Sequence, residues 1–151
     1  MALMSLDIFL DSYHRRYALA GDSNSIRKMA RQFGWMDIPD VDLQLIDKNR
    51  VILVTDTEQR IVFASSNMII MNGYTPGEVL GKTPRMFQGE STEPKSRAVI
   101  RNAMSRLRPF HVVLTNYRKN GVPYLCEIES FPMLNRHHMP VHFIAFENII
   151  P

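Results

Sequence analysis

Residues 110–131 contain the pattern that most restricts how this chain folds. Two runs rich in β-branched and aromatic residues, Phe110–Arg118 and Pro123–Phe131, lie on either side of Lys119-Asn120-Gly121. Asn-Gly is strongly favoured in tight hairpin turns, because both of its residues tolerate positive φ. The sequence therefore predicts two antiparallel strands joined by a short turn.

Three further strands are predicted where β-branched and other apolar residues cluster, at Val51–Thr55, Arg60–Ala64 and Val141–Ile149. Helical segments separate the first two strands from the hairpin. Asn67–Asn72 and Pro76–Leu80 are each followed by a glycine, and Thr92 is expected to cap a longer helix with Pro94 in its first turn. Strands, then helices, then strands indicate an α+β fold with a five-stranded antiparallel sheet and short helices on one face.

The N-terminal segment has a helical period instead. Ser5–Ala20 is predicted to be a helix that ends at Gly21, and Asp22 or Ser23 to cap a second helix that ends at Gly34. The first helix carries an apolar stripe of Ile8, Phe9, Tyr13 and Tyr17. Such a stripe has to be buried, either on the domain's own sheet or against a second copy of the chain. We favour a homodimer.

Composition sets the broad class. The change of period near residues 37–50 divides the chain into a helical extension, residues 1–46, and a main domain, residues 47–151.

Cys126 is the single cysteine, which excludes an intramolecular disulfide and fits a reducing compartment. No apolar run is long enough to span a bilayer. We therefore expect a cytoplasmic protein that has no membrane partner. Because the chain ends directly after the last strand, we expect a stand-alone module or a fragment.

Strand alternation predicts which side chains share a face of the sheet. Asn116 shares a face with Phe110, Val112 and Leu114, and Cys126 and Glu147 are expected on corresponding faces of the following strands. A sheet face that short helices close over is a typical place for a small-molecule pocket.

Three stretches of the main domain carry a resemblance to a known family. Ile61–Ala64 together with Asn72–Gly81 is similar to the strand-helix entry of PAS domains and its "G-Y-x-x-E-E-V-x-G" run. Gly81–Gly89 resembles "G-R-N-C-R-F-L-Q-G", and Asn116–Tyr124 resembles "N-Y-R-K-D-G-x-P-F", of the light-oxygen-voltage (LOV) branch. The resemblance covers residues 47–148 and implies the PAS fold, a sensory function and FMN as cofactor.

The resemblance also implies a set of cofactor-binding positions. Arg85, Gln88, Arg101 and Asn116 match flavin-contacting residues. Arginines suit a phosphate and amides suit the polar edges of the flavin ring and chain. The basic residues have a second interpretation as a solvated helix face, and the sequence leaves both open.

Four positions depart from the LOV pattern. Pro84 replaces the reactive cysteine and has no nucleophilic atom, which excludes a covalent bond to a flavin there. Thr83 and Cys126 replace amides, and Glu147 replaces a glutamine with an acid whose burial needs a partner or a raised pKa. These changes weaken flavin binding. Cys126 is more often small apolar filling than a redox residue, and Glu147 would either tune a ligand or pair with an arginine.

The predicted function is a non-catalytic PAS-type sensory or protein-interaction domain without cysteinyl-flavin photochemistry. The alternative is an FMN-binding protein that responds by redox change or photoreduction. A signalling protein and a small molecule are the other expected partners. We do not expect an enzyme, because no activated nucleophile or phosphate loop is apparent. A DNA-binding role for residues 5–35 is less favoured, since acidic residues interrupt the basic ones. His137 and His138 have no third ligand at suggestive spacing, so no metal site is predicted.

Overall fold

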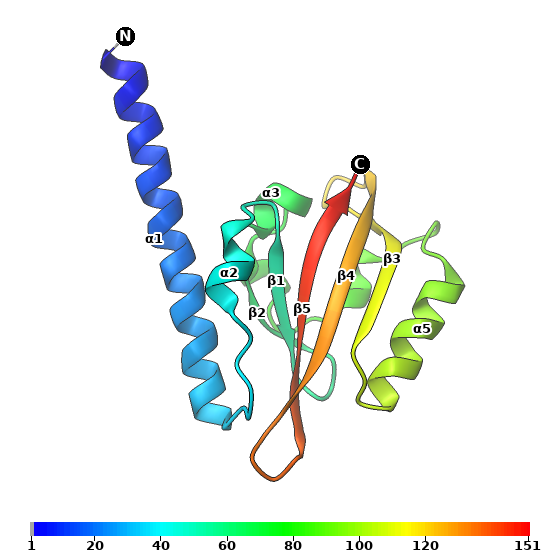
Figure 1. The fold of residues 1–151 in the computed structure, drawn as a ribbon. Coiled ribbons are helices and arrows are strands. Elements are labelled where there is room, and N and C mark those ends of the chain that lie inside the picture. The colour runs from blue at the N-terminus through cyan, green and yellow to red at the C-terminus, as the bar shows by residue number, and fades with distance from the viewer. Residues whose placement is uncertain (1) are drawn as a thin grey trace.

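All five predicted strands form and pair into one antiparallel sheet, in the order β2-β1-β5-β4-β3 (Figure 1). The computed structural model describes the backbone of residues 2–151 and the side chains of residues 6, 8 and 10–151, so the predicted burial of Phe9 lies outside the described side chains. The α+β class and the PAS-type sheet are therefore confirmed. The strands are β1 (Val51–Thr55), β2 (Ile61–Ala64), β3 (Phe110–Tyr117), β4 (Pro123–Leu134) and β5 (Pro140–Ile150).

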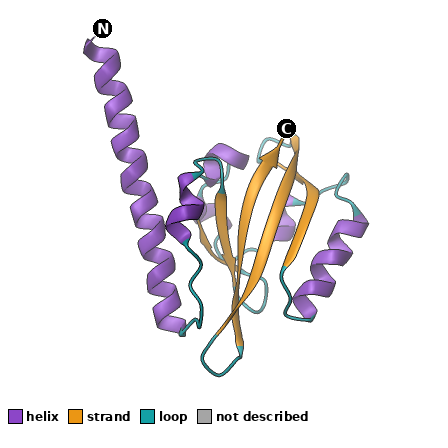
Figure 2. Cartoon of the chain, in the orientation of Figure 1, coloured by secondary structure: helices purple, strands orange, loops and turns teal. Residues whose placement is uncertain are grey.

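The helices lie on both sides of this sheet (Figure 2). A long helix precedes the domain, and short ones connect β2 to β3. None of them, within the part of the chain that the structure describes, is long and apolar enough to cross a membrane. They are α1 (Ala2–Phe33), α2 (Val41–Ile46), α3 (Met68–Asn72), α4 (Pro76–Val79), the 3-10 helix η1 (Pro84–Phe87) and α5 (Pro94–Ser105).

The inner face of the sheet packs against α3, α4, η1 and α5. Leu53, Leu114 and Ile128 project from the sheet, and Met68 and Phe87 meet them from the helices. The alternation predicted for β3, β4 and β5 is confirmed, because Asn116, Cys126 and Glu147 are buried on this same side. This layer is the core in which a cavity forms.

On the outer face of the sheet, α1 and α2 pack mainly over β1 and β5, with Met133 of β4 and Val62 and Phe63 of β2 at the border of this layer. The C-terminal half of α1 supplies Ile26 and Ala30, which pack with Ile144 and Phe146 of β5. Trp35, just after α1, donates a hydrogen bond from Nε1 to Nδ1 of His142 at 3.0 Å. This bond needs an unprotonated Nδ1, and burial lowers the pKa of His142, which favours that state.

The prediction that α1 ends at Gly21 is wrong, because the helix continues from Ala2 to Phe33. A helical glycine costs only about 1 kcal/mol relative to alanine, and tertiary contacts offset it here. Asp22 accepts hydrogen bonds from the amide and hydroxyl of Ser66, at 2.9 and 2.7 Å. Ser23 donates to Asp42 of α2 at 2.6 Å. The two residues expected to cap a second helix instead hold α1 to the domain.

One helix was not predicted, and one predicted cap is wrong. The segment between Gly34 and the first strand contains α2, which buries Val41 and Leu45. Thr92 does not cap α5, because the N-cap residue is Glu93. The Thr92 hydroxyl instead donates to the carbonyl oxygen of Thr115 at 2.6 Å, and so ties the start of α5 to β3.

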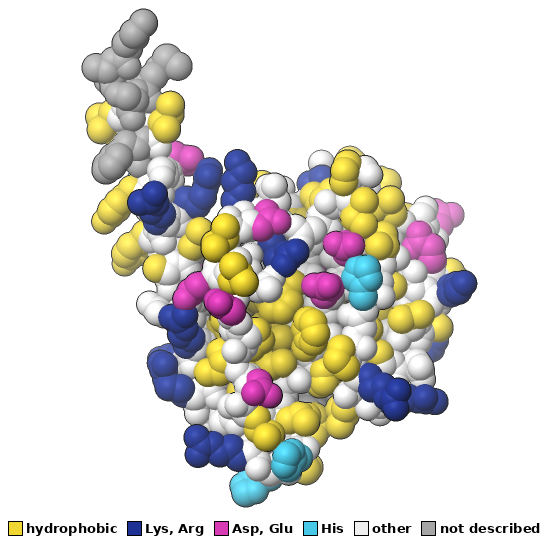
Figure 3. Space-filling view, viewed as in Figure 1, with side chains coloured by type: hydrophobic (Ala, Val, Ile, Leu, Met, Phe, Trp, Pro, Cys, Tyr) yellow, Lys and Arg dark blue, Asp and Glu magenta, His cyan; other side chains and the backbone are white. Residues whose placement is uncertain are grey.

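The N-terminal half of α1 projects beyond the domain (Figure 1). Its side chains Ile8, Tyr13 and Tyr17 are 68%, 58% and 76% exposed. Of the two candidates for burying this stripe, the domain's own sheet does not cover these three side chains. Apolar side chains also remain open on the outer face of the sheet, where Figure 3 shows them between acidic ones; Leu125 and Phe131 of β4 belong to this group.

The docking of α1 predicts that Ile26→Ala destabilises the domain. Ile26 is fully buried between α1 and the sheet, so its truncation is expected to cost about 2–5 kcal/mol of unfolding free energy in a urea titration. The matched control is Ile70→Ala on α3, where the side chain is 72% exposed and a change below about 0.5 kcal/mol is expected. Equal effects of the two substitutions would contradict the docking.

Candidate functional site

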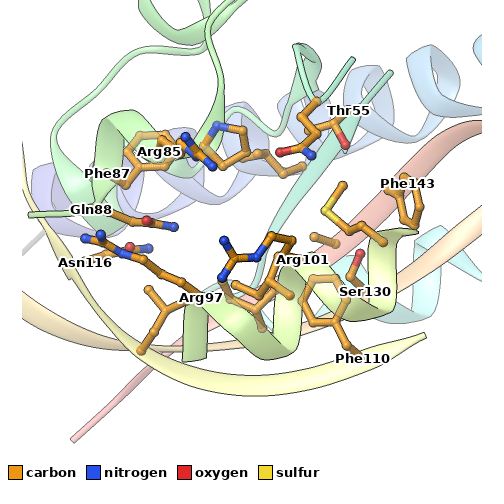
Figure 4. Close-up of a pocket in the computed structure, with 18 of the residues that line it drawn as sticks. Thr55, Arg85, Phe87, Gln88, Arg97, Arg101, Phe110, Asn116, Ser130 and Phe143 are labelled. Atoms are coloured by element: carbon orange, nitrogen blue, oxygen red, sulfur yellow. The ribbon is translucent and has the colours of Figure 1, made fainter. Parts of the chain in front are cut away.

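A cavity of about 550 Å³ lies between the inner face of the sheet and the helices η1 and α5 (Figure 4). Its size is typical of small-molecule sites. Apolar side chains form most of its wall, and a smaller set of polar ones interrupts them. The lining includes Leu53, Pro84, Phe87, Ile100, Met104, Phe110, Leu114, Ile128, Phe143 and Ala145, with the polar residues Thr55, Gln59, Arg85, Gln88, Arg97, Arg101, Asn116, Ser130 and Glu147.

Arginines from two elements border this cavity. Arg85 comes from η1, and Arg97 and Arg101 come from α5 on the other side (Figure 4). Arg97 donates to the carbonyl oxygen of Gly89 at 3.2 Å. Among the described residues, no carboxylate oxygen lies within 4.0 Å of any of these three guanidinium groups. The helices that border the cavity therefore carry positive charge that no nearby carboxylate neutralises.

The sheet side of the cavity contains one buried polar atom with no partner, and a second lies on the neighbouring strand outside the lining. Asn116 of β3 is 3% exposed, and its side-chain oxygen accepts no hydrogen bond from any described residue. The hydroxyl of Tyr124, opposite Asn116 on β4, is also unpartnered within the described part of the chain. Buried polar atoms are nearly always hydrogen-bonded, so an orphaned amide oxygen in a cavity wall indicates a site for a donor.

Glu147 of β5 supplies the acidic group of the cavity. Its side chain is buried, and the thiol of Cys126 donates to Oε2 across 3.7 Å. Removal from water raises the pKa of Glu147 to about 7, because the charged carboxylate is poorly solvated there. Burial and the neighbouring Glu147 also raise the pKa of the Cys126 thiol. Cys126 therefore stays protonated, which supports its interpretation as small filling.

The predicted cofactor positions separate into two groups. Arg85, Gln88, Arg101, Asn116 and Glu147 all line the one cavity, although they come from four elements or their adjoining turns. Cys126 and Thr83 do not line the cavity. Cys126 contacts the carboxyl group of Glu147, and Thr83 is the N-cap residue of η1. Their contact with a ligand stays a prediction.

Sequence reasoning missed Arg97 as a cavity residue. It stands one helical turn before Arg101, and residues four apart share a helix face. That spacing was the available signal. Thr55, Gln59 and Ser130 were missed as well. Thr55 ends the otherwise apolar β1, Gln59 lies in the turn after it, and Ser130 follows Glu129 in β4.

A glycine shapes the turn that follows η1. A Cβ atom on Gly89 would lie 2.5 Å from Cε2 of Tyr117, so no other residue fits there without displacing that ring. The Tyr117 hydroxyl accepts a hydrogen bond from the Ser91 amide at 2.9 Å. The Gly81–Gly89 stretch that resembles LOV domains thus ends where the backbone closes tightly on β3.

Metal ligands do not gather in the part of the chain that the structure describes. No group of three or more histidine, cysteine, aspartate or glutamate side chains is suitably placed there. Both His137 and His138 are exposed, in the turn between β4 and β5.

Comparison with known proteins agrees with this architecture. The PAS domain family matches residues 48–149, more than half of the chain. The chain belongs to this family. Blue-light photoreceptors of Listeria innocua and Listeria monocytogenes are 33% and 31% identical over 98 and 112 residues, which is 62% and 72% of this chain. The chain spans 39% and 44% of their lengths, so less than half of either protein.

Solved structures place the domain in the LOV type. A light-oxygen-voltage domain studied with a flavin analogue superposes with a TM-score of 0.69 at 26% identity, covering 77% of this chain and 87% of the other. The light-state LOV domain of the blue-light photoreceptor Aureochrome1 has a TM-score of 0.65 at 25% identity, with coverage of 76% and 90%. The chain is thus a PAS domain of the LOV type, a sensory fold, with proline at position 84.

The buried Glu147 predicts a pH-dependent stability. Its pKa in the folded state, about 7, lies above the ordinary value of 4.5, so between these pH values the unfolded chain releases a proton that the folded chain keeps. Stability is therefore lost as pH rises through this window. Glu147→Gln removes that loss. We expect it to raise the unfolding free energy by on the order of 2 kcal/mol at pH 8 and to change it little at pH 4.

Urea unfolding at both pH values measures this effect. Glu129→Gln, at an exposed position on the same sheet, is the matched control and should show no such pH-dependent gain. A Glu147→Gln variant no more stable than the unsubstituted protein at pH 8 would show that the carboxylate is well solvated or paired.

Proposed function

We propose that this domain is a non-catalytic sensory module that binds a small anionic ligand in its cavity and signals without cysteine-based photochemistry. One observation carries the proposal. A cavity open on the side of the arginines presents an unpartnered Asn116 oxygen on the sheet and arginines without carboxylate partners on the helices, with Pro84 in its wall. Cys126 is the single cysteine, and its buried, protonated thiol is a poor nucleophile.

FMN is the ligand that fits these residues best. The Asn116 oxygen is free to accept from a ring N–H, and the Gln88 side chain can bond the polar edge of the ring. The guanidinium groups of Arg85 and Arg101 suit a phosphate. Glu147, protonated below about pH 7, retains the hydrogen-bond donor that a glutamine would provide. When bound, a flavin would supply light absorption and a redox centre.

Flavin uptake by the purified protein tests this proposal. We expect added FMN to bind and to show the structured absorption of a held flavin, and Asn116→Ala to weaken its affinity by about tenfold, since one hydrogen bond of about 1.5 kcal/mol is lost. Asn120→Ala, in the exposed β3–β4 turn, is the control. A protein that takes up no FMN at any concentration tested would exclude flavin as the ligand.

The expected absence of a light-driven covalent bond between the protein and a flavin has a separate test. Pro84 lines the cavity and carries no group that can bond a flavin. Blue light should therefore cause no dark-reversible loss of the flavin absorption band, whereas Pro84→Cys should gain one if the ring lies against this position. Reversible bleaching of the unsubstituted protein would contradict the proposal.

A redox or photoreduction response is the second candidate. Glu147 favours it, because this cavity-lining carboxyl can take up or release a proton near pH 7. Reduction of the FMN-loaded protein by light and a mild electron donor would support this candidate. A cytoplasmic location is proposed on the single buried cysteine, which suits a reducing compartment.

A second copy of the chain is the proposed partner of α1. Leu6, Leu10, Tyr13 and Tyr17 are exposed and follow one another at spacings of four, three and four residues. This is the heptad spacing of a coiled coil, in which the same stripe on two helices interlocks. At 3.6 residues per turn the stripe lies roughly 150° around the helix from Ile26 and Ala30, which face the domain. A partner can therefore bind α1 without displacing the sheet.

Light scattering after size-exclusion chromatography tests this interface. We expect a dimer for the unsubstituted protein and a monomer for the double variant Leu10→Ser, Tyr17→Ser. Ile8→Ser is the matched control. The sequence pattern grouped Ile8 with Tyr13 and Tyr17, but at 3.6 residues per turn this 68% exposed side chain lies on the opposite side of the helix from the heptad stripe Leu6, Leu10, Tyr13 and Tyr17. A monomeric unsubstituted protein, or dissociation caused equally by the control, would contradict the dimer.

A further inference from the structure

The segment that follows α1 is anchored to the sheet through the side chain of Trp35. Its indole N–H donates to Nδ1 of His142 on β5 at 3.0 Å, and the two side chains are only 6% and 3% exposed. A ring nitrogen accepts a hydrogen bond only when it carries no proton. This bond therefore exists only while His142 is neutral, with its proton on Nε2.

Backbone contacts make this bond part of a larger junction between α1 and the β4–β5 hairpin. Trp35 forms an isolated β-bridge with Asn135, and the amide of Met36 donates to the carbonyl oxygen of Leu134 at 2.9 Å. Phe33, the last residue of α1, packs edge-on against the His142 ring, with the ring centroids 4.7 Å apart. The end of the helix and the hairpin thus meet around one imidazole.

The surroundings of His142 offer little to a positive charge. Phe33 and Trp35 meet the ring from the side of α1, and Met133 is its paired residue on β4; none of the three is charged. Asp56, which follows β1, is the charged group that acts on the ring among the described residues. Burial lowers the pKa of His142 below the ordinary value of 6.5, and Asp56 opposes this only in part.

A proton on Nδ1 converts the acceptor of this bond into a second donor. Two N–H groups then face each other, and the buried indole loses its partner. The contacts that Ile26 and Ala30 make with the sheet are apolar and do not depend on this proton. Protonation therefore acts on the end of α1 and not on the whole docked half of the helix.

We infer that Trp35 and His142 form a pH-sensitive latch, which holds the end of α1 on the sheet while His142 is neutral and opens when His142 takes up a proton. Because the pKa of His142 is lowered in the folded chain, the stabilisation by the latch is complete above pH 6.5. It is lost as pH falls through the folded-state pKa. The latch does not depend on any ligand in the cavity.

Trp35 is the single tryptophan of the chain, so its fluorescence and its indole N–H resonance report on the latch directly. We expect its emission maximum to shift to longer wavelength between about pH 7.5 and 5, a range in which ordinary carboxylates stay mostly charged. The transition should involve one proton and have its midpoint below pH 6.5, and the indole N–H resonance should lose its hydrogen-bonded position over the same range.

Two substitutions assign this transition. His142→Gln should keep the short-wavelength emission and lose the transition, because the amide oxygen can accept the indole N–H and does not titrate. His137→Gln, at an exposed position in the turn of the same hairpin, is the matched control and should retain the transition.

An emission maximum that stays fixed over this pH range overturns the latch. A transition that persists in His142→Gln also overturns it, and would assign the effect to another group such as Glu147, which lies on the opposite face of the sheet. If thermal unfolding shows that His142→Gln is misfolded, an NMR titration of the imidazole in the unsubstituted protein decides. Its midpoint has to coincide with that of the fluorescence, and separate midpoints contradict the latch. Trp35→Phe should raise the pKa of His142, since the bond that favours the neutral ring is removed; an unchanged pKa contradicts the latch as well.

Discussion

The rest of the structure depends on the insertion of the last strand into the middle of the sheet. β5 pairs with β1 on one side and β4 on the other, so without it β1–β2 and β3–β4 are two separate hairpins. Isolated hairpins are marginally stable in water. Because β5 alternates, Ala145 and Glu147 face the cavity while Ile144 and Phe146 face α1. Neither core layer is complete until this strand is in place.

The central position of β5 also relates the cavity to α1. A ligand in the cavity would contact Glu147 of β5. The preceding residue on this strand, Phe146, faces the opposite side and packs in the layer that contains Ile26 and Ala30 of α1. Strands are stiff elements, and packed layers resist small displacements. A change at the cavity thus has a direct physical route to the helix that carries the exposed heptad stripe, without any other domain. β5 therefore contributes side chains both to the cavity wall and to the layer that holds α1.

Local signals in the sequence, alternation and turn residues, were sufficient for the sheet and for its side of the cavity, whereas Arg85, Gln88 and Arg101 were assigned only through the resemblance to LOV domains. Asn116 and Glu147 were assigned to the inner side by counting along strands, and they lie there. Contacts between segments that are distant in the sequence could not be predicted from these local signals. Gly21 failed to end α1 because Ser66 and Asp42, both remote in sequence, bind the residues after it. In the same way Thr115 takes up the side chains of Thr92 and Glu93.

Polar groups in the cavity wall lower the stability of the unliganded domain. Each buried donor or acceptor without a partner costs about 1–3 kcal/mol of stability. The side-chain oxygen of Asn116 has no partner among the described residues, and Glu147 has only the weak thiol contact from Cys126. Close packing with apolar residues would stabilise the fold more, as the neighbouring Leu114 and Ile128 do. A ligand that hydrogen-bonds to these groups binds only the folded chain. It raises the free energy of unfolding by RT ln(1 + [L]/Kd). The same residues that make the empty cavity unfavourable therefore make the folded state sensitive to its occupant, as a sensor requires.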